Sequence, residues 1–262
     1  MSKIITVANQ KGGVGKTTTT VNLSAALAAT KRRVLLIDMD PQGNATMGSG
    51  IDKNDLGLSV CNVLLGETDI VDAITQVPVA NYDVLPANAD LTAAEIQLID
   101  RINREKQLDL ALRDIRDNYD YILIDCPPSL NMLTINALVA ANAVMIPMQC
   151  EYYALEGLSS LLDTVEQIRV SVNPQIKIEG LLRTMYDSRN NLSNDVSSEL
   201  VEHFGDQVYR TVIPRNISLA EAPSYGQPIL HYNKGCRGSM AYLALAGEVL
   251  RRDAGQSHHA NP

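Results

Sequence analysis

The chain has 262 residues, of which 45% are hydrophobic, and its 22 Lys and Arg against 30 Asp and Glu give a formal net charge of −8. This length accommodates a sizeable α/β core, while the absence of any apolar run of roughly 18–20 residues and of a signal-peptide pattern argues against a membrane span or secretion. The four cysteines form no CxxC pair, which favours reduced thiols over disulfides or zinc, and the overall acidity argues against a generic nucleic-acid coat protein.

Short apolar runs rich in β-branched residues alternate with helical patterns along the chain. Strands are predicted at residues 4–8, 33–37, 82–85, 121–124, 143–147, 178–182 and 208–213. Most of these runs are continuously apolar, which is typical of parallel strands buried on both faces. A leucine-rich stripe over 155–168 predicts one helix, the capping-box spacing of Thr92 and Glu95 predicts another, and 238–252 is predicted as the last.

This βα order predicts one α/β domain, a doubly wound and mostly parallel sheet flanked by helices. No repeat and no clear linker interrupts the pattern. We expect the domain to cover residues 1–253 and residues 254–262 to form a flexible tail. Because the first predicted strand begins almost at once, we expect no helix-turn-helix domain before it.

The strongest local signal follows the first predicted strand, in the segment Lys11-Gly12-Gly13-Val14-Gly15-Lys16-Thr17-Thr18. A glycine-rich turn that leads into a helix offers backbone N–H donors and the positive end of the helix dipole to a polyphosphate. We expect Lys16 to reach the β- and γ-phosphates and the Thr17 hydroxyl to bind Mg²⁺ directly. The usual P-loop pattern, G-x-x-x-x-G-K-[ST], begins with glycine, whereas this chain has Gln10 there, followed by Lys11. The loop is therefore a deviant P-loop of the P-loop NTPase type.

Acidic residues follow two of the predicted strands. Asp38 and Asp40 come after the strand at 33–37, and Asp125 follows the strand at 121–124. The carboxyl ends of parallel strands form the ligand crevice of an α/β sheet, so these carboxylates are expected beside the nucleotide. We expect Asp125 to hold Mg²⁺ through water. Asp40 lies in a loop that can move with the nucleotide state, and we expect it to orient the attacking water.

The P-loop segment and residues 38–44 and 124–129 resemble those of the deviant Walker A ATPases. From Lys3 to about Arg252 the chain is similar to the ParA/Soj chromosome-partitioning ATPases, and segments 147–157, 212–216 and 220–224 fit that group more narrowly. The resemblance implies a Mg²⁺-dependent ATPase that forms an ATP-bound homodimer in the cytoplasm. It also implies that Lys11 reaches the partner's nucleotide, that Pro214 and Asn216 hold adenine, and that a ParB-type centromere-binding protein stimulates hydrolysis.

The resemblance further implies that the ATP-bound dimer binds DNA without sequence preference and associates with the nucleoid. Residues 1–176 carry 13 Lys and Arg against 21 Asp and Glu, whereas residues 177–262 carry 9 of each. The acidic excess thus lies outside the last third, where basic side chains are free to contact phosphates. We expect DNA contacts from Arg189, Arg215 and Lys234, although relatives often carry a basic residue at the position of Ser218.

Other functions remain open at this stage. A MinD-like membrane-cycling ATPase would need an amphipathic C-terminal helix, and residues 255–262 are polar instead. An ATPase that positions a protein cluster or partitions a plasmid fits the same motifs. A nitrogenase-type iron–sulfur protein would need cluster cysteines, and Cys126 lacks matched cluster segments around it. A non-enzymatic scaffold that only binds ATP would lack phosphate release stimulated by a partner.

Overall fold

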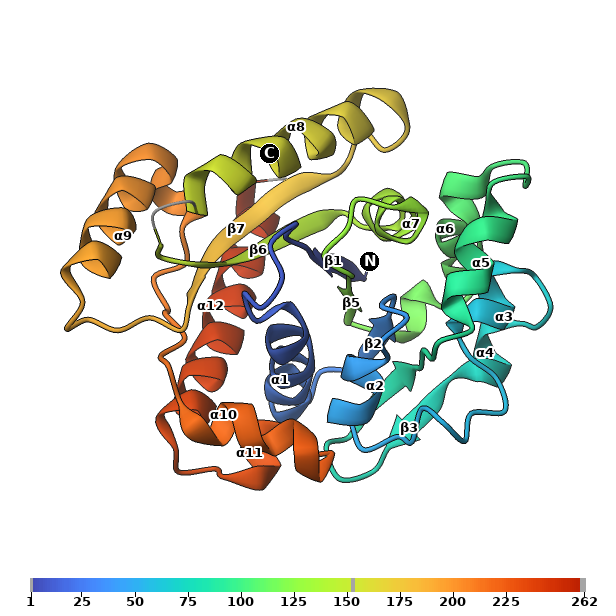
Figure 1. Cartoon of the computed structure of the whole chain (residues 1–262), viewed down its shortest axis with the longest axis horizontal. Coiled ribbons are helices and arrows are strands. Elements are labelled where there is room, and N and C mark those ends of the chain that lie inside the picture. Colours follow the sequence, from blue (N-terminus) through green and yellow to red (C-terminus); the bar gives the residue numbers. More distant parts are fainter. Residues whose placement is uncertain (1, 152–153, 260–262) are drawn as a thin grey trace.

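The computed structural model describes residues 2–151 and 154–259, and side chains at 154–156 and 256–259 are left aside. A seven-stranded sheet has the order β3-β4-β2-β5-β1-β6-β7 (Figure 1). The strands are β1 (Lys3–Val7), β2 (Val34–Asp38), β3 (Thr75–Val77), β4 (Tyr82–Leu85), β5 (Tyr121–Asp125), β6 (Ala143–Gln149) and β7 (Lys177–Thr184). β3 pairs antiparallel to β4, and the other neighbouring strands are parallel. This confirms the predicted doubly wound, mostly parallel sheet.

Helices cover both faces of this sheet (Figure 1). The α-helices are α1 (Lys16–Ala29), α2 (Asn44–Gly48), α3 (Val60–Leu64), α4 (Ile70–Ala73), α5 (Leu91–Leu98), α6 (Gln107–Leu112), α7 (Met132–Ala140), α8 (Ala154–Ser171), α9 (Asn191–Phe204), α10 (Ile217–Glu221), α11 (Ile229–Tyr232) and α12 (Arg237–His259). Short 3₁₀ turns are η1 (Arg104–Lys106), η2 (Arg116–Asn118), η3 (Gly205–Gln207) and η4 (Ala222–Tyr225).

The core forms two layers because alternate residues of each strand point to opposite faces of the sheet. On β5, Ile122 and Ile124 belong to the layer that includes residues of α5–α8, whereas Leu123 belongs to the layer that includes residues of α1 and α12. All three side chains are fully buried. The continuous apolar runs of the central strands follow from this burial on both faces.

The predicted strand at 208–213 is wrong. This segment runs beside β7 but makes only isolated parallel bridges, from Val208 to Leu181 and from Pro214 to Tyr186. The backbone N–H groups of Arg210 and Thr211 donate to the Glu248 carboxylate on α12, at 2.8 and 2.9 Å. Because these donors are used by a side chain, they do not extend a ladder with β7.

Three further differences concern element ends. The capping box at Thr92 and Glu95 is wrong, because α5 already begins at Leu91 with Asp90 at its N-cap. The edge strand β3 was not predicted, since it has three residues and two of them are exposed. α12 continues through His259, so positions 254–259 are helical where a flexible tail was predicted. One glycine and no proline occur in these six positions, so no residue there blocks a helix. Residues 260–262 of the predicted tail lie outside the described residues.

Candidate nucleotide site and basic pocket

The P-loop connects β1 to α1 and leaves the start of the helix open. Gly13 and Gly15 have φ of 75° and 87°, left-handed conformations that favour glycine. A side chain placed at Gly12 or Gly13 would meet nothing within 4 Å, so the loop borders free space. Within the described chain, no side chain caps α1 and no acidic residue lies in its first turn. Its N-terminal amides are therefore available to an anion.

Lys16 is the first residue of α1, at the end of this loop, and is 6% exposed. Its Nζ donates to the carbonyl oxygen of Lys11 at 3.2 Å. Burial lowers the pKa of Lys16, while the nearby Asp125 and Asp40 carboxylates act in the opposite direction. The ammonium group thus donates to a neutral carbonyl oxygen of the loop, and phosphate oxygens would replace that acceptor.

Two buried carboxylates lie side by side beneath the loop. Asp38 and Asp125 are directly opposite each other in the parallel register of β2 and β5, and both are fully buried. The hydroxyls of Thr17 and Thr20 donate to the Oδ2 and Oδ1 of Asp125, at 2.7 and 3.0 Å. Burial raises the pKa of Asp125, and the Asp38 carboxylate raises it further. Burial likewise raises the pKa of Asp38.

This donor set suits magnesium. Carboxylate and hydroxyl oxygens are the hard ligands that Mg²⁺ prefers, and Thr17 and Asp125 bring one of each together. Burial raises the pKa of each carboxyl because it disfavours the negative charge, so positive charge beside the two groups would compensate for their burial. A divalent cation near these two groups would provide that compensation.

Asp40 is held in a tight turn after β2 and is 8% exposed. Its N–H donates to Asp38 Oδ1 at 3.1 Å, and its own Oδ1 accepts from the N–H of Gln42 at 2.9 Å. Its carbonyl oxygen accepts from the N–H of Gly43 at 2.8 Å. In this arrangement hydrogen bonds hold the backbone on both sides of Asp40, and movement of the loop with the nucleotide state stays a prediction.

Lys11 forms an ion pair within its own subunit. Its Nζ lies 2.6 Å from Glu151 Oε2, and the two side chains are 42% and 51% exposed. The sequence placed Glu151 in a family-like segment but gave no reason to pair it with Lys11. An ion pair this exposed contributes little stability and is easily exchanged for another partner.

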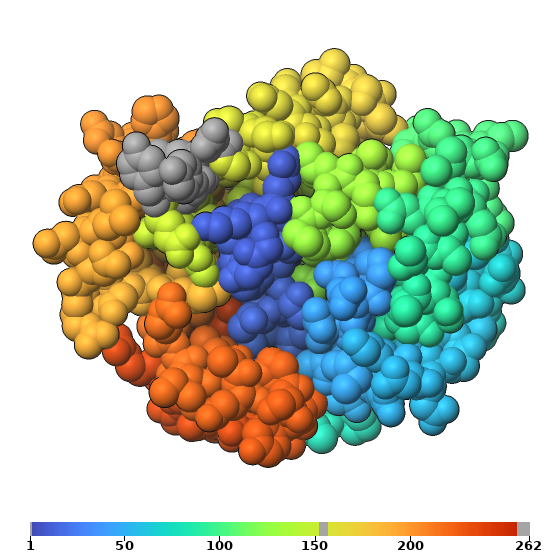
Figure 2. Space-filling model, viewed as in Figure 1, coloured from blue at the N-terminus to red at the C-terminus, as the bar shows by residue number. Residues whose placement is uncertain are grey.

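The adenine candidates Pro214 and Asn216 follow the segment beside β7. Thr184, the last residue of β7, donates its hydroxyl to the carbonyl oxygen of Val14 at 2.7 Å and so fastens the P-loop to this strand. Tyr186, two residues later, bridges to Pro214. Asn216 caps α10, its Oδ1 accepting from the N–H of Leu219 at 3.1 Å. Thr184 carried no recognisable signal in the sequence. Figure 2 shows the blue N-terminal segment exposed on this face, bordered by orange residues of the last third.

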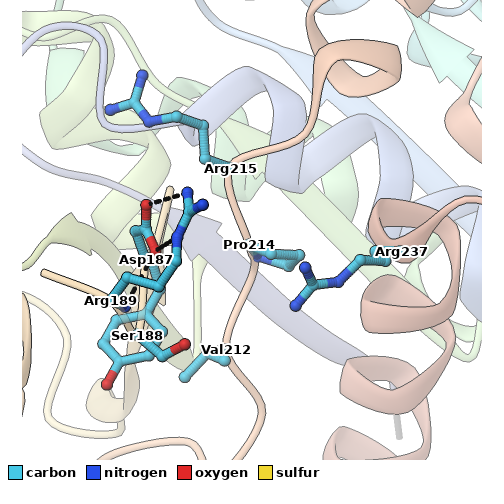
Figure 3. Close-up of a pocket in the computed structure, with 8 residues that line it drawn as sticks. Asp187, Ser188, Arg189, Val212, Pro214, Arg215 and Arg237 are labelled. Carbon is cyan, nitrogen blue, oxygen red and sulfur yellow. Dashed lines mark hydrogen bonds and ion pairs between the residues drawn. The ribbon is translucent and has the colours of Figure 1, made fainter.

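A second feature is a cavity of about 430 Å³ with a basic lining, which we call the arginine pocket (Figure 3). It is lined by Tyr186, Asp187, Ser188, Arg189, Val212, Pro214, Arg215 and Arg237. The structure thus brings together the predicted Arg189 and Arg215 and adds Arg237, the first residue of α12. The predicted Lys234 is exposed in the turn before α12 and does not line the pocket.

Arg189 makes a bidentate ion pair in this pocket. Its Nε and Nη2 lie 2.9 and 2.8 Å from the two carboxylate oxygens of Asp187. These hydrogen bonds lower the pKa of Asp187 to about 2. The Arg189 side chain is 89% exposed, so its outer edge remains accessible to a phosphate.

Two structural features bear on the alternative functions. Among the side chains that the structure describes, which leave out 154–156 and 256–259, no three His, Cys, Asp or Glu gather closely enough to hold a metal ion. Over the same residues, no helix combines the length and the apolar character needed to span a bilayer. Cys126 is fully buried beside the crevice, and burial raises the pKa of its thiol.

The sequence of this chain is similar to those of several known proteins. Residues 2–178 match the family described as AAA domain. The chain is 55% identical over 249 residues to the sporulation initiation inhibitor protein Soj of Bacillus subtilis, covering 95% of this chain and 98% of Soj. It is 52% identical over 253 residues to the chromosome partitioning protein ParA of Caulobacter vibrioides, covering 96% and 95%.

Solved structures agree with this fold. A cobyrinic acid a,c-diamide synthase from Mycobacterium smegmatis with bound ADP and magnesium superimposes with a TM-score of 0.84 at 39% identity, covering 96% of this chain and 95% of that chain. The cell division ATPase MinD of Pyrococcus furiosus superimposes with a TM-score of 0.80 at 27% identity, covering 96% and 99%.

Proposed function

The chain belongs to the ParA/Soj family of chromosome-partitioning ATPases, as its motifs predicted, and we propose that it works as a Mg²⁺-dependent ATP switch. In this proposal ATP binding creates a homodimer that binds DNA without sequence preference. A ParB-type centromere-binding partner then accelerates hydrolysis and releases the dimer. The protein would accordingly act in the cytoplasm, on the nucleoid.

Nucleotide binding is supported by the open N-terminus of α1 beside a buried lysine. The amides of Gly13–Thr18 and the Lys16 ammonium would surround the β- and γ-phosphates of ATP. Thr17 would hold Mg²⁺ directly and Asp125 through water, and the cation would supply positive charge to the phosphate oxygens. Pro214 and Asn216 are proposed to hold adenine, as in the family.

Hydrolysis needs an oriented water and stabilisation of the charge on the transferring phosphoryl group. We assign Asp40 to the water, because its carboxylate is close enough to Lys16 to affect its pKa and its backbone is fixed on both sides. Lys11 would supply positive charge across the dimer. To do so it must exchange Glu151 for the partner's nucleotide, and the exposure of that ion pair makes this exchange inexpensive.

DNA binding is supported by the arginine pocket. Three arginines, Arg189, Arg215 and Arg237, line one cavity. Guanidinium groups bind phosphates without reading base sequence, and the resulting affinity falls with salt. One pocket per protomer is a modest contact, whereas an ATP-bound dimer would present two.

ATP turnover measured with DNA and with the candidate partner, separately and together, tests this function. We expect slow basal hydrolysis, synergistic stimulation by the two additions, and no sedimentation with liposomes in the presence of ATP. The Asp40→Ala variant should bind ATP and dimerise but fail to turn over. Indifference to both additions would contradict the partitioning role, and an Asp40→Ala protein with parental turnover would contradict the assignment of Asp40.

A further inference from the structure

Thr46 is a buried residue of α2 that makes three hydrogen bonds next to the turn that holds Asp40. It is 0% exposed. Its N–H and its hydroxyl both donate to Asp38 Oδ2, each at 2.8 Å. The hydroxyl oxygen accepts from the backbone N–H of Ala87, just after β4, at 2.9 Å. Thr46 therefore connects the Asp38 carboxylate, at the end of β2, to the backbone just after β4.

The other oxygen of Asp38 holds Asp40. Asp38 Oδ1 accepts from the backbone N–H of Asp40 at 3.1 Å. Since one carboxylate plane carries both oxygens, fixing Oδ2 through Thr46 also fixes the direction of Oδ1. The position of Asp40 thus depends on the Thr46 side chain, six residues further along the chain.

The same loop is also fastened by Ala87 and Lys53. A Cβ at Gly43 would lie 2.6 Å from the carbonyl oxygen of Ala87, so the loop backbone packs directly on that residue. Lys53 Nζ donates to the carbonyl oxygen of Gln42 at 2.5 Å. Ala87 consequently packs against Gly43 of the loop through its carbonyl oxygen, while its N–H donates to the Thr46 hydroxyl on α2.

We propose that Thr46 is a positioning residue for ATP hydrolysis, acting through Asp38 to place Asp40 in its reactive geometry. This inference rests on the proposed ATPase function and on the role assigned there to Asp40. Catalysis is sensitive to such placement, because a displacement of about 1 Å far from the chemistry can cost on the order of 100-fold in rate. ATP binding, in contrast, depends on the P-loop, which Thr46 does not contact through any of these hydrogen bonds.

Thr46→Val removes the hydroxyl and keeps the β-branched shape, so it isolates the hydrogen bonds. We expect kcat to fall by about 10-fold to 100-fold while the Kd for ATP stays within about twofold of the parent. Thr46→Ser, which retains the hydroxyl, should keep kcat within about threefold of the parent. If Thr46→Val does not fold, the pair Thr46→Ser and Thr46→Ala repeats the comparison of hydroxyl with no hydroxyl.

Ser49→Ala is the matched control, because Ser49 is also buried in this region and its hydroxyl does not bond to Asp38. It donates to the carbonyl oxygen of Ala45 and accepts from Tyr82, both at 2.8 Å. We expect Ser49→Ala to lower the melting temperature and keep kcat. If Thr46→Val retains parental kcat, or if both variants lose kcat in proportion to stability, Thr46 is merely structural and the inference fails. A parental protein without any hydrolysis, with DNA and partner present, would overturn the proposed function as well.

Discussion

The arginine pocket gives a quantitative expectation for DNA binding through Arg237. Arg237→Gln removes one guanidinium per protomer from a cavity that Arg189 and Arg215 also line (Figure 3). We expect the fold to tolerate the change, because Arg237 is exposed and a cation at the start of α12 gains nothing from the helix dipole. The effect should therefore appear in DNA affinity.

The size of the effect follows from counterion release. Each phosphate contact contributes about −0.9 to the slope of log affinity against log salt concentration. An ATP-bound dimer loses two such contacts, so the slope should become less negative by about 1.8. Between about 50 and 200 mM salt, the parental affinity should then fall about 12-fold further than that of the variant.

The assay is a salt titration of DNA binding with a non-hydrolysable ATP analogue. Arg113→Gln is the matched control: it removes the same charge from the end of α6, where Arg113 is 59% exposed and pairs with Asp109. Its slope should equal that of the parent. Equal slopes for Arg237→Gln and the parent would refute the phosphate contact. Equal losses in both variants would show that net charge, and not the pocket, sets the affinity.

Three further outcomes are expected. Lys16→Ala should abolish tight ATP binding in equilibrium titration, because it removes the cation at the phosphate site, and nucleotide affinity at the parental level would contradict that role. In protein free of nucleotide and Mg²⁺, burial raises the pKa of Asp38 to about 6 and that of Asp125 to about 8. The folded state therefore binds more protons than the unfolded state in this pH range. As the pH rises from about 4 to about 8, the parent should lose stability relative to Asp125→Asn. Urea unfolding at several pH values measures this, and a pH-independent difference would exclude the buried charge as its cause. Gly180→Ala should lower the free energy of unfolding by about 1–3 kcal/mol, because the new Cβ would lie 2.7 Å from a tyrosine ring carbon, whereas Gly235→Ala, with nothing within 4 Å, should be near neutral.

The sequence by itself determined the parts of this protein that depend on neighbouring residues. The glycine-rich P-loop, Lys16 and Thr17 follow one another along the chain, and the loop must lead from a strand into a helix. The apolar runs before Asp38 and Asp125 predicted central parallel strands, and such strands bring their carboxyl ends to one edge. The β2–β5 register then places these two carboxylates side by side, as that argument required.

Only the tertiary structure decided which distant residues meet. Glu248 on α12 takes the backbone donors of Arg210 and Thr211, so an apolar run that reads as a strand remains outside the sheet. The partnership of Thr46 with Ala87 joins residues 41 positions apart. Arg237 reaches the arginine pocket because α12 begins against Asn216 and Leu219, next to Pro214 and Arg215. Local sequence sets backbone preference and burial, whereas these contacts arise from how whole elements pack, and no periodic pattern records that packing.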